Sequence, residues 1–251
     1  MKRNLFFHTP IMNAAGTLGF APDFRNIADM GAPELGAFTT NPLSLRPRLP
    51  TASPALVEYP GGFLLHTGLP NPGLSAAIKK YARRWADSPL PIIVHLMADR
   101  PEETARMVES LEELENVMAA ELGFAPLLTD DIILTSLEMS LGELPLIVSL
   151  PAEQVLHLGP RLVEAGAQAV SIAAPRGTLN AADGSLVSGR LYGPALFPQS
   201  LAIVRDAVRV GIPMIGGGGV YQQEQAQIMQ EAGAMAVQLD AILWRGGFSS
   251  Q

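Results

Sequence analysis

Eight short apolar runs recur along the 251 residues of this chain, and most of them lead into a helical pattern. The runs cover residues 11–15, 36–41, 91–97, 117–122, 145–150, 169–174, 212–216 and 236–241. Most are apolar throughout, which is typical of parallel strands that are covered on both faces. Eight strands with helical crossovers in this length predict an α/β fold of the (β/α)8 (TIM) barrel type, as a single domain over residues 1–251. A doubly wound open sheet is the structural alternative.

The helical patterns between these runs cover residues 24–30, 74–85, 101–116, 130–141, 152–165, 196–208 and 222–232. Pro101 followed by Glu102 and Glu103 indicates a helix start, because proline suits the first turn and acids suit the positive end of the helix dipole. After the eighth run only ten residues remain, 242–251, so we expect a truncated last helix. The apolar surface that such a helix leaves uncovered favours self-association, and we expect a homo-oligomer.

Composition narrows the range of partners. The net charge of −7 leaves no basic stripe to neutralise phosphates, which argues against nucleic acid. The chain has no cysteine, so disulfides, thiolate metal sites and a cysteine nucleophile are excluded. No apolar stretch reaches the ~20 residues that span a bilayer. The first residues lack a signal-like apolar region, so we expect a soluble cytoplasmic protein.

The strongest local motif covers residues 212–220, where an apolar run ends in four glycines and a helical pattern follows. Glycine lets a backbone approach an anion without a Cβ in the way, and a helix N-terminus offers unpaired N–H groups and a favourable dipole. The junction therefore predicts a phosphate cradle. A flexible tight turn is the alternative interpretation, because glycine motifs of this kind are weakly specific.

Two long connections follow strand ends, where barrels build their active sites. Residues 42–72 are rich in proline and glycine, and residues 175–194 carry Arg176, Asp183, Arg190 and Tyr192. We expect both connections to be loops. Arg176 and Arg190 would either contact an anion close to the predicted phosphate position or lie solvated in the loop.

Several segments, in order along nearly the whole chain, resemble the dihydroorotate dehydrogenase family. They cover residues 10–19, 36–40, 46–48, 54–58, 61–73, 192–195, 216–219 and 234–239, and residues 61–73 are the most specific match. The resemblance implies an FMN-binding (β/α)8 barrel whose relatives oxidise dihydroorotate in pyrimidine synthesis. If this chain is active in that manner, it is a flavin-dependent oxidoreductase of the CH–CH donor class.

The resemblance also implies binding residues. Those assigned to the flavin and its phosphate are Ala14, Ala15, Gly16, Gly193, Gly217, Gly218 and Gly219, and Asn71 is a retained substrate-binding asparagine. In relatives a glycine–threonine pair completes the phosphate cradle, whereas this chain has Asp240 and Ala241. A carboxylate a few ångströms from a phosphate is repulsive by about 1–4 kcal/mol, so Asp240 argues against FMN.

The family's charged and catalytic residues are largely replaced. Asn41 and Ser149 stand where relatives have lysines that contact the flavin and neutralise its reduced ring. Residues 121–126 lack the catalytic base and the asparagines of the corresponding family loop. Because the loss of one electrostatic group of this kind typically costs about 10²–10³ in rate, we expect a degenerate active site that does not oxidise dihydroorotate.

Two histidines are candidate catalytic residues. His95 at a strand end and His66 in the long loop could form an acid–base or metal pair, together with Glu121. In the alternative interpretation both are ordinary polar residues and Glu121 has a structural role in the barrel, which is the role we favour for it. No metal-ligand spacing supports a metal, and none is expected.

Three functions follow from these observations. The chain is a flavin-dependent oxidoreductase with another substrate, a non-catalytic relative that binds a ligand or partner, or a non-redox barrel enzyme acting on a phosphorylated metabolite. The expected ligand is a small molecule that can carry a phosphate, and for the non-catalytic relative a partner chain is the other possibility.

Overall fold

Eight parallel strands form a closed barrel in this computed structural model, which describes residues 4–23, 27, 33–245 and 247–248. The order around the barrel is β1-β12-β11-β8-β7-β6-β5-β2. The strands are β1 (Ile11–Asn13), β2 (Phe38–Thr39), β5 (Ile92–Ala98), β6 (Val117–Phe124), β7 (Leu146–Leu150), β8 (Ala169–Ile172), β11 (Met214–Gly217) and β12 (Ala236–Leu239). Each overlaps one of the eight predicted runs, so the barrel prediction is confirmed and the open-sheet alternative is wrong.

The barrel closes between β1 and β2 at a seam that contains little backbone pairing. A single parallel bridge joins Met12 to Ala37. The Asn13 side chain adds two bonds, because its Oδ1 accepts the Thr39 N–H at 2.9 Å and its Nδ2 donates to the Thr39 carbonyl at 2.6 Å. At this seam the hydrogen bonds of one buried side-chain amide therefore replace part of the backbone pairing that joins the other strands.

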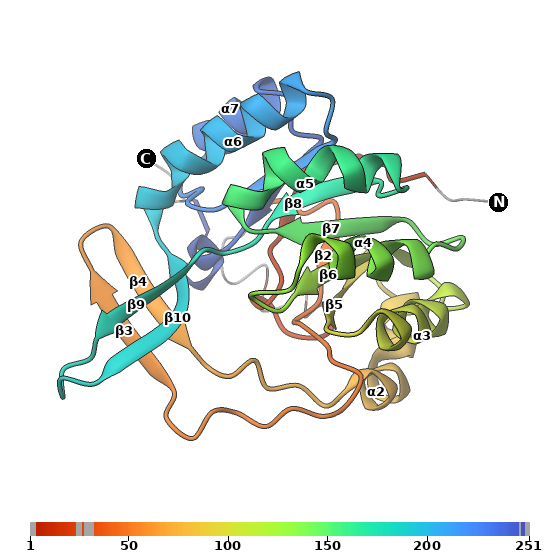
Figure 1. Ribbon diagram of the computed structural model, residues 1–251, viewed down its shortest axis with the longest axis horizontal. Helices are drawn as coiled ribbons and strands as arrows, with labels where there is room; N and C mark the ends of the chain where they lie inside the picture. Colours follow the sequence, from red (N-terminus) through yellow and green to blue (C-terminus); the bar gives the residue numbers. More distant parts are fainter. Residues whose placement is uncertain (1–3, 24–26, 28–32, 246, 249–251) are drawn as a thin grey trace.

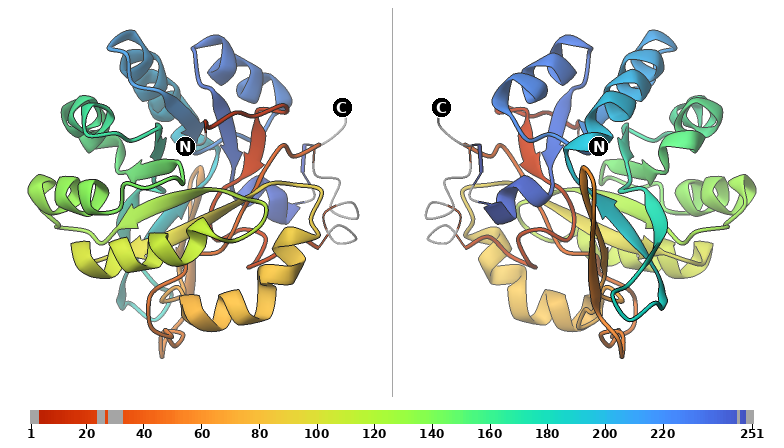
Figure 2. Two further views of the ribbon diagram at one scale, coloured as in Figure 1. Left: turned by 90° about the vertical axis from the view of Figure 1, so that its right-hand side faces the viewer. Right: turned by 90° about the vertical axis from the view of Figure 1, so that its left-hand side faces the viewer.

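In the part of the chain that the structure describes, six α-helices with assigned bounds surround the barrel, and Figure 2 shows them on its outside. They are α2 (Leu74–Ala86), α3 (Pro101–Glu112), α4 (Asp130–Met139), α5 (Ala152–Glu164), α6 (Phe197–Arg209) and α7 (Gln223–Glu231), preceded at α6 by the short 3-10 helix η1 (Pro194–Leu196). Helix α3 begins at Pro101 with Glu102 and Glu103 in its first turn, as predicted. The helix predicted over residues 24–30 lies almost wholly outside the described residues. None of the described helices is both long and apolar enough to span a bilayer.

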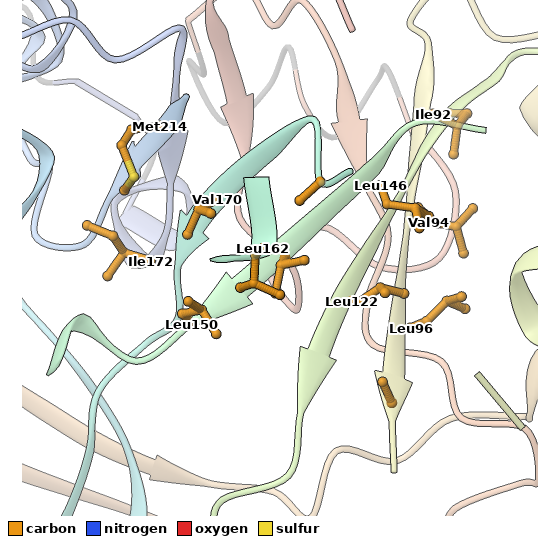
Figure 3. Packing of buried hydrophobic residues seen from close by; sticks show 14 of the residues in the cluster. Ile92, Val94, Leu96, Leu122, Leu146, Leu150, Leu162, Val170, Ile172 and Met214 are labelled. Atoms are coloured by element: carbon orange, nitrogen blue, oxygen red, sulfur yellow. The ribbon is translucent and has the colours of Figure 1, made fainter. Parts of the chain in front are cut away.

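Apolar side chains pack on both faces of the barrel sheet. The outer layer fills the space between strands and helices, and Figure 3 shows Leu162 of α5 beside Leu150 and Val170 of two neighbouring strands. The inner layer contains one residue from or next to each of the eight strands, and Phe7 packs with it: Met12, Ala37, Ile93, Ala119, Ile147, Ala169, Ile215 and Ala236. This inner layer makes the lower part of the barrel a packed core, as expected for this fold.

A second sheet stands at the end of the barrel where the strands finish (Figure 1). Its antiparallel order is β3-β4-β10-β9, from β3 (Ala55–Tyr59), β4 (Gly62–His66), β9 (Arg176–Asn180) and β10 (Leu186–Tyr192). The prediction of two loops over 42–72 and 175–194 is therefore wrong. Asp183 and Gly184 carried the overlooked signal, because an Asp–Gly pair between short strands favours a hairpin, and here Asp183 Oδ1 accepts the Ser185 N–H at 2.9 Å.

The last described element is the 3-10 helix η2 (Ala241–Arg245), which follows β12 directly. No α-helix follows β12 in the part of the chain that the structure describes. Leu243 is buried, and the Trp244 indole donates a hydrogen bond to the Thr17 carbonyl at 2.9 Å. The short element thus packs on the loop after β1. Self-association through this region stays a prediction.

Candidate active site at the barrel mouth

The barrel interior changes from apolar to polar within one layer. Alternate residues of a strand point to the same face, so the residues two positions after the apolar inner layer form the next layer toward the mouth. Six of them are polar and buried: Thr39, His95, Glu121, Ser149, Ser171 and Gln238. The register supports this arrangement, since His95 is paired with Glu121 and Ser149 with Ser171.

Glu121 is the centre of a buried hydrogen-bond network that joins four strands. Its Oε2 lies 2.7 Å from His95 Nδ1. Its Oε1 accepts hydrogen bonds from Ser171 Oγ at 2.6 Å and from Gln238 Nε2 at 2.8 Å. Burial alone would raise the pKa of this carboxyl, but the hydrogen bonds and the neighbouring imidazole hold the pKa below its usual range. Glu121 is therefore ionised at neutral pH.

An ionised Glu121 fixes the tautomer of His95. The carboxylate can only accept, so the imidazole carries its proton on Nδ1. The other nitrogen, Nε2, has no hydrogen-bond partner among the described residues and lies against Gly123 at the cavity wall. An imidazole oriented by a carboxylate, with its second nitrogen free of hydrogen bonds among the described residues, is the arrangement of a general base.

Gly123 leaves the room that this imidazole needs. A Cβ at position 123 would overlap the His95 ring. Replacing Gly123 with alanine is therefore expected to push the ring off Glu121 and to lower the free energy of unfolding by about 1–3 kcal/mol. Urea denaturation measures this loss. Glu109→Ala, at an exposed position of α3, is the comparison, and equal losses in the two variants would contradict the packing argument.

The mouth of the barrel contains a cavity of about 480 Å³ above this network. Of the residues that the resemblance assigns to the flavin, Ala14, Ala15, Gly217 and Gly218 line it. Gly16 lines an adjoining cavity of about 220 Å³, together with Asn41 and His66. The first loop and the glycine junction are thus brought together, as the resemblance implies.

The glycine junction forms a tight corner of the larger cavity. Gly218 and Gly219 have φ values of 89° and 76°, and a Cβ at Gly219 would overlap the backbone nitrogen of Phe197. Gly193, the remaining glycine implied by the resemblance, packs directly against the backbone of Gly61. Before the helix that follows, Gln225 Oε1 accepts the N–H groups of Tyr221 and Gln222, so these two donors are not available to a ligand.

Asp240 occupies this corner. The side chain is only 6% exposed, and its Oδ2 accepts the Gly219 N–H at 3.5 Å. Its Oδ1 is buried and has no hydrogen-bond partner in the described part of the chain. Burial raises the pKa of Asp240 to about 6, although the backbone N–H groups of Gly219 and Ala241 act in the opposite direction. The chain thus places its own carboxylate where the sequence predicts a bound phosphate.

His66 and Asn71 lie away from the polar layer. His66 ends β4 in the second sheet, where its Nε2 lies 3.2 Å from Thr51 Oγ1, so the structure does not bring it to His95. Asn71 is 7% exposed, and its Oδ1 accepts the backbone N–H groups of Ser44 and Gly73. It does not line either mouth cavity. The described residues contain no cluster of three or more potential metal-binding side chains of the His, Cys, Asp and Glu types.

An eight-stranded α/β barrel with a polar cavity at the carboxyl ends of its strands belongs to the TIM-barrel class, whose active sites lie at that end.

The family model described as dihydroorotate dehydrogenase matches residues 3–123. The catalytic subunit of dihydroorotate dehydrogenase B (NAD(+)) from Pelobacter propionicus is 31% identical, over 94% of this chain and 84% of the relative. The same subunit from Geotalea uraniireducens is 29% identical, over 92% and 82%. The chain belongs to the dihydroorotate dehydrogenase family.

A solved structure agrees with this assignment at the level of the fold. The crystal structure of DHODH from Eimeria tenella in complex with ferulenol superimposes with a TM-score of 0.74 and covers 97% of this chain and 78% of that chain. The two sequences are 17% identical, so this likeness shows the fold alone.

Sequence reasoning identified part of the polar layer. It proposed that His95 and Glu121 could interact and singled out Asp240, but it missed Ser171 and Gln238 as partners of Glu121. The sequence pattern could have identified both residues, because Ser171 and Gln238 each lie two positions after a small apolar residue of the inner layer, Ala169 and Ala236. Counting in steps of two from the inner layer finds both.

Proposed function

We propose that this chain is a dihydroorotate dehydrogenase homologue with a degenerate catalytic site, which binds a small molecule at the barrel mouth and does not oxidise dihydroorotate with FMN. The observation that carries the proposal is the buried carboxylate of Asp240 in the glycine corner, with one oxygen unpartnered. The lost family residues support it, since Asn41 and Ser149 stand in place of lysines.

The FMN phosphate does not fit this corner. A phosphate ester carries about 1.5–2 negative charges at neutral pH. At about 4 Å from an ionised carboxylate, repulsion costs on the order of 4 kcal/mol per unit charge for an effective dielectric near 20. Asp240 is ionised above its raised pKa of about 6, and no described lysine or arginine lies within ion-pair distance of it. The glycines that would contact a phosphate instead face the chain's own anion.

The polar layer favours proton transfer as the chemistry of the site. Glu121 holds the His95 imidazole with Nδ1 protonated, and Nε2 is left to accept a proton from a bound molecule or return one to it. This pair favours a non-redox barrel enzyme over a purely non-catalytic binding protein. In this proposal His95 is the catalytic residue, and Glu121 is the residue that positions it.

Flavin binding tests the first part of the proposal. The purified chain is expected to be colourless and to give no heat with FMN at about pH 7.5 in titration calorimetry. Asp240→Gly removes both the charge and the side chain, and we expect it to bind FMN at least about tenfold more tightly than the parent chain. Asp240→Asn separates the loss of charge from the gain of space, and Asp206→Asn on the surface of α6 is the matched control.

Turnover tests the second part. We expect no dihydroorotate oxidation by the parent chain supplied with FMN and a soluble electron acceptor. The triple variant Asp240→Gly, Asn41→Lys and Ser149→Lys is also expected to be inactive, because it restores the cations but not a base on the loop after β6. A yellow parent protein that keeps its flavin through gel filtration, or turnover by the parent chain, would overturn the proposal.

A further inference from the structure

Two arginines of the second sheet face each other at the opening of both mouth cavities. Arg176 in β9 is paired in register with Arg190 in β10, so the two side chains leave the sheet on the same face. Both line the larger and the smaller cavity, together with Tyr192. The β9–β10 hairpin thus places a pair of guanidinium groups where the cavities meet.

These two positive charges have no acidic partner. In the described part of the chain no carboxylate lies within 4 Å of either guanidinium. Like charges directly opposite each other in a sheet are destabilising. Burial and the charge of Arg190 lower the pKa of Arg176, as expected for a cation held beside another cation. A bound anion would remove this repulsion.

We propose that the barrel mouth binds a small organic molecule whose oxyanion, a carboxylate or a phosphate monoester, pairs with Arg176 and Arg190, while a hydroxyl or amine of the same molecule donates to Asp240. Guanidinium groups suit this role because their fork of N–H donors matches both kinds of oxyanion. The unpartnered Asp240 Oδ1 needs a donor, which a phosphate at neutral pH does not supply. This proposal rests on the proposed function, because it requires the glycine corner to be free of a phosphate.

Tyr192 connects the two ends of this site. It is buried at the end of β10, and the charges of Arg190 and Asp240 both act on its phenol group. Arg176, Arg190 and Asp240 line the same cavity, so one small ligand can reach both the arginine end and the carboxylate end. Compared with an FMN site, the polarity is reversed: the anion lies at the hairpins, and the glycine corner accepts a hydrogen bond through Asp240.

Matched pairs of small molecules test the anion site in the unmodified protein. Orotate and uracil differ by a carboxylate, and ribose 5-phosphate and ribose differ by a phosphate. In titration calorimetry we expect at least one anion to bind about tenfold or more tightly than its neutral counterpart, with an affinity that falls as salt is added. The pair that shows the difference identifies the oxyanion. Equal binding within both pairs, or no binding of either anion at millimolar concentration, overturns the proposal.

Variants locate the anion. Arg176→Gln and Arg190→Gln are each expected to weaken anion binding about 10- to 100-fold and to leave binding of the neutral counterpart unchanged. Arg190→Lys keeps the charge without the planar fork and is expected to lose less. Arg205→Gln, at an exposed arginine of α6, is the control and is expected to bind normally. Anion binding that is insensitive to both arginine variants, in folded protein, overturns the proposal.

Asp240→Ala distinguishes the arginine pair from the glycine corner. If the phosphate of ribose 5-phosphate lies at the arginines, this variant loses a hydrogen bond and binds the ligand more weakly. Tighter binding would place the phosphate in the glycine corner and overturn the inference. The FMN and turnover experiments are independent of these results: they decide the proposed function, whereas insensitivity to the arginine variants removes only the anion site.

Discussion

Glu121→Ala is expected to lower the free energy of unfolding by about 3–5 kcal/mol, because several buried donors lose a charged acceptor at once. The variant leaves three buried donors without their acceptor, at His95 Nδ1, Ser171 Oγ and Gln238 Nε2. Urea denaturation at about pH 7.5 measures the loss, because the midpoint shifts while the slope stays constant if the fold is unchanged.

Two comparisons give this result its meaning. Ser171→Ala removes one donor from the same network and is expected to cost about 1 kcal/mol. Glu109→Ala replaces an exposed carboxylate on α3 and is expected to change stability by less than about 0.5 kcal/mol. If Glu121→Ala lowered the free energy of unfolding as little as Glu109→Ala, the network would not stabilise the barrel. The orientation of His95 by Glu121 would then no longer support a catalytic role for His95.

Asp240→Asn is expected to stabilise the protein at neutral pH and to leave it little changed at about pH 4. The pKa of Asp240 is raised from 3.8 to about 6 in the folded chain, so the native state binds this proton more tightly than the unfolded state does. Protonated Asp240 therefore stabilises the folded state. This contribution is complete below the pKa of the unfolded chain, and it is lost as the pH rises through the pKa of about 6 in the folded chain. At about 1.4 kcal/mol per unit, the loss above about pH 6 reaches roughly 3 kcal/mol, which the variant recovers.

Unfolding curves at several pH values between about 4 and 8 measure this effect. The parent chain should lose stability relative to Asp240→Asn across that interval, and the difference should level off above the folded pKa. Asp99→Asn, at an exposed aspartate between β5 and α3, should follow the parent chain throughout. Parallel curves for Asp240→Asn and the parent chain would mean that the Asp240 carboxylate is solvated in the native state.

A carboxylate that reduces stability at neutral pH indicates a role in binding. Proteins depart from local rules of stability mainly at functional sites, where the cost is tolerated for the sake of a ligand. Asp240 and the Arg176–Arg190 pair are two such departures, and they border the same cavity. The stability measurements and the binding measurements therefore both test whether the charged groups around this cavity are there to bind a ligand.

The barrel could be predicted from the sequence because its strands are buried on both faces and appear as continuous apolar runs. The second sheet could not be predicted in the same way. Its strands are short and partly exposed, as in the alternating burial of β9, and their pairing joins two segments more than a hundred residues apart. The turns at Pro60 and Gly61 and at Asp183 and Gly184 were the only two local signals of its hairpins among the described residues.

The candidate site was predicted in part for the same reason. Residues on barrel strands, such as His95 and Glu121, have positions fixed by register, so their meeting follows from the fold. His66 lies on β4 of the second sheet, and its position depends on the pairing that the sequence did not reveal. The role of Asn71 in substrate binding stays a prediction, since its side chain is engaged by the loop that precedes α2.

The seam between β1 and β2 has a consequence for how this barrel opens. Around the rest of the barrel, neighbouring strands are joined by runs of backbone pairing, but here one bridge and the Asn13 side chain close the ring. Local opening in proteins begins where the fewest cooperative bonds must break. Because Ala14 follows Asn13 directly and lines the larger cavity, local opening of the ring at this seam would occur beside the ligand cavity.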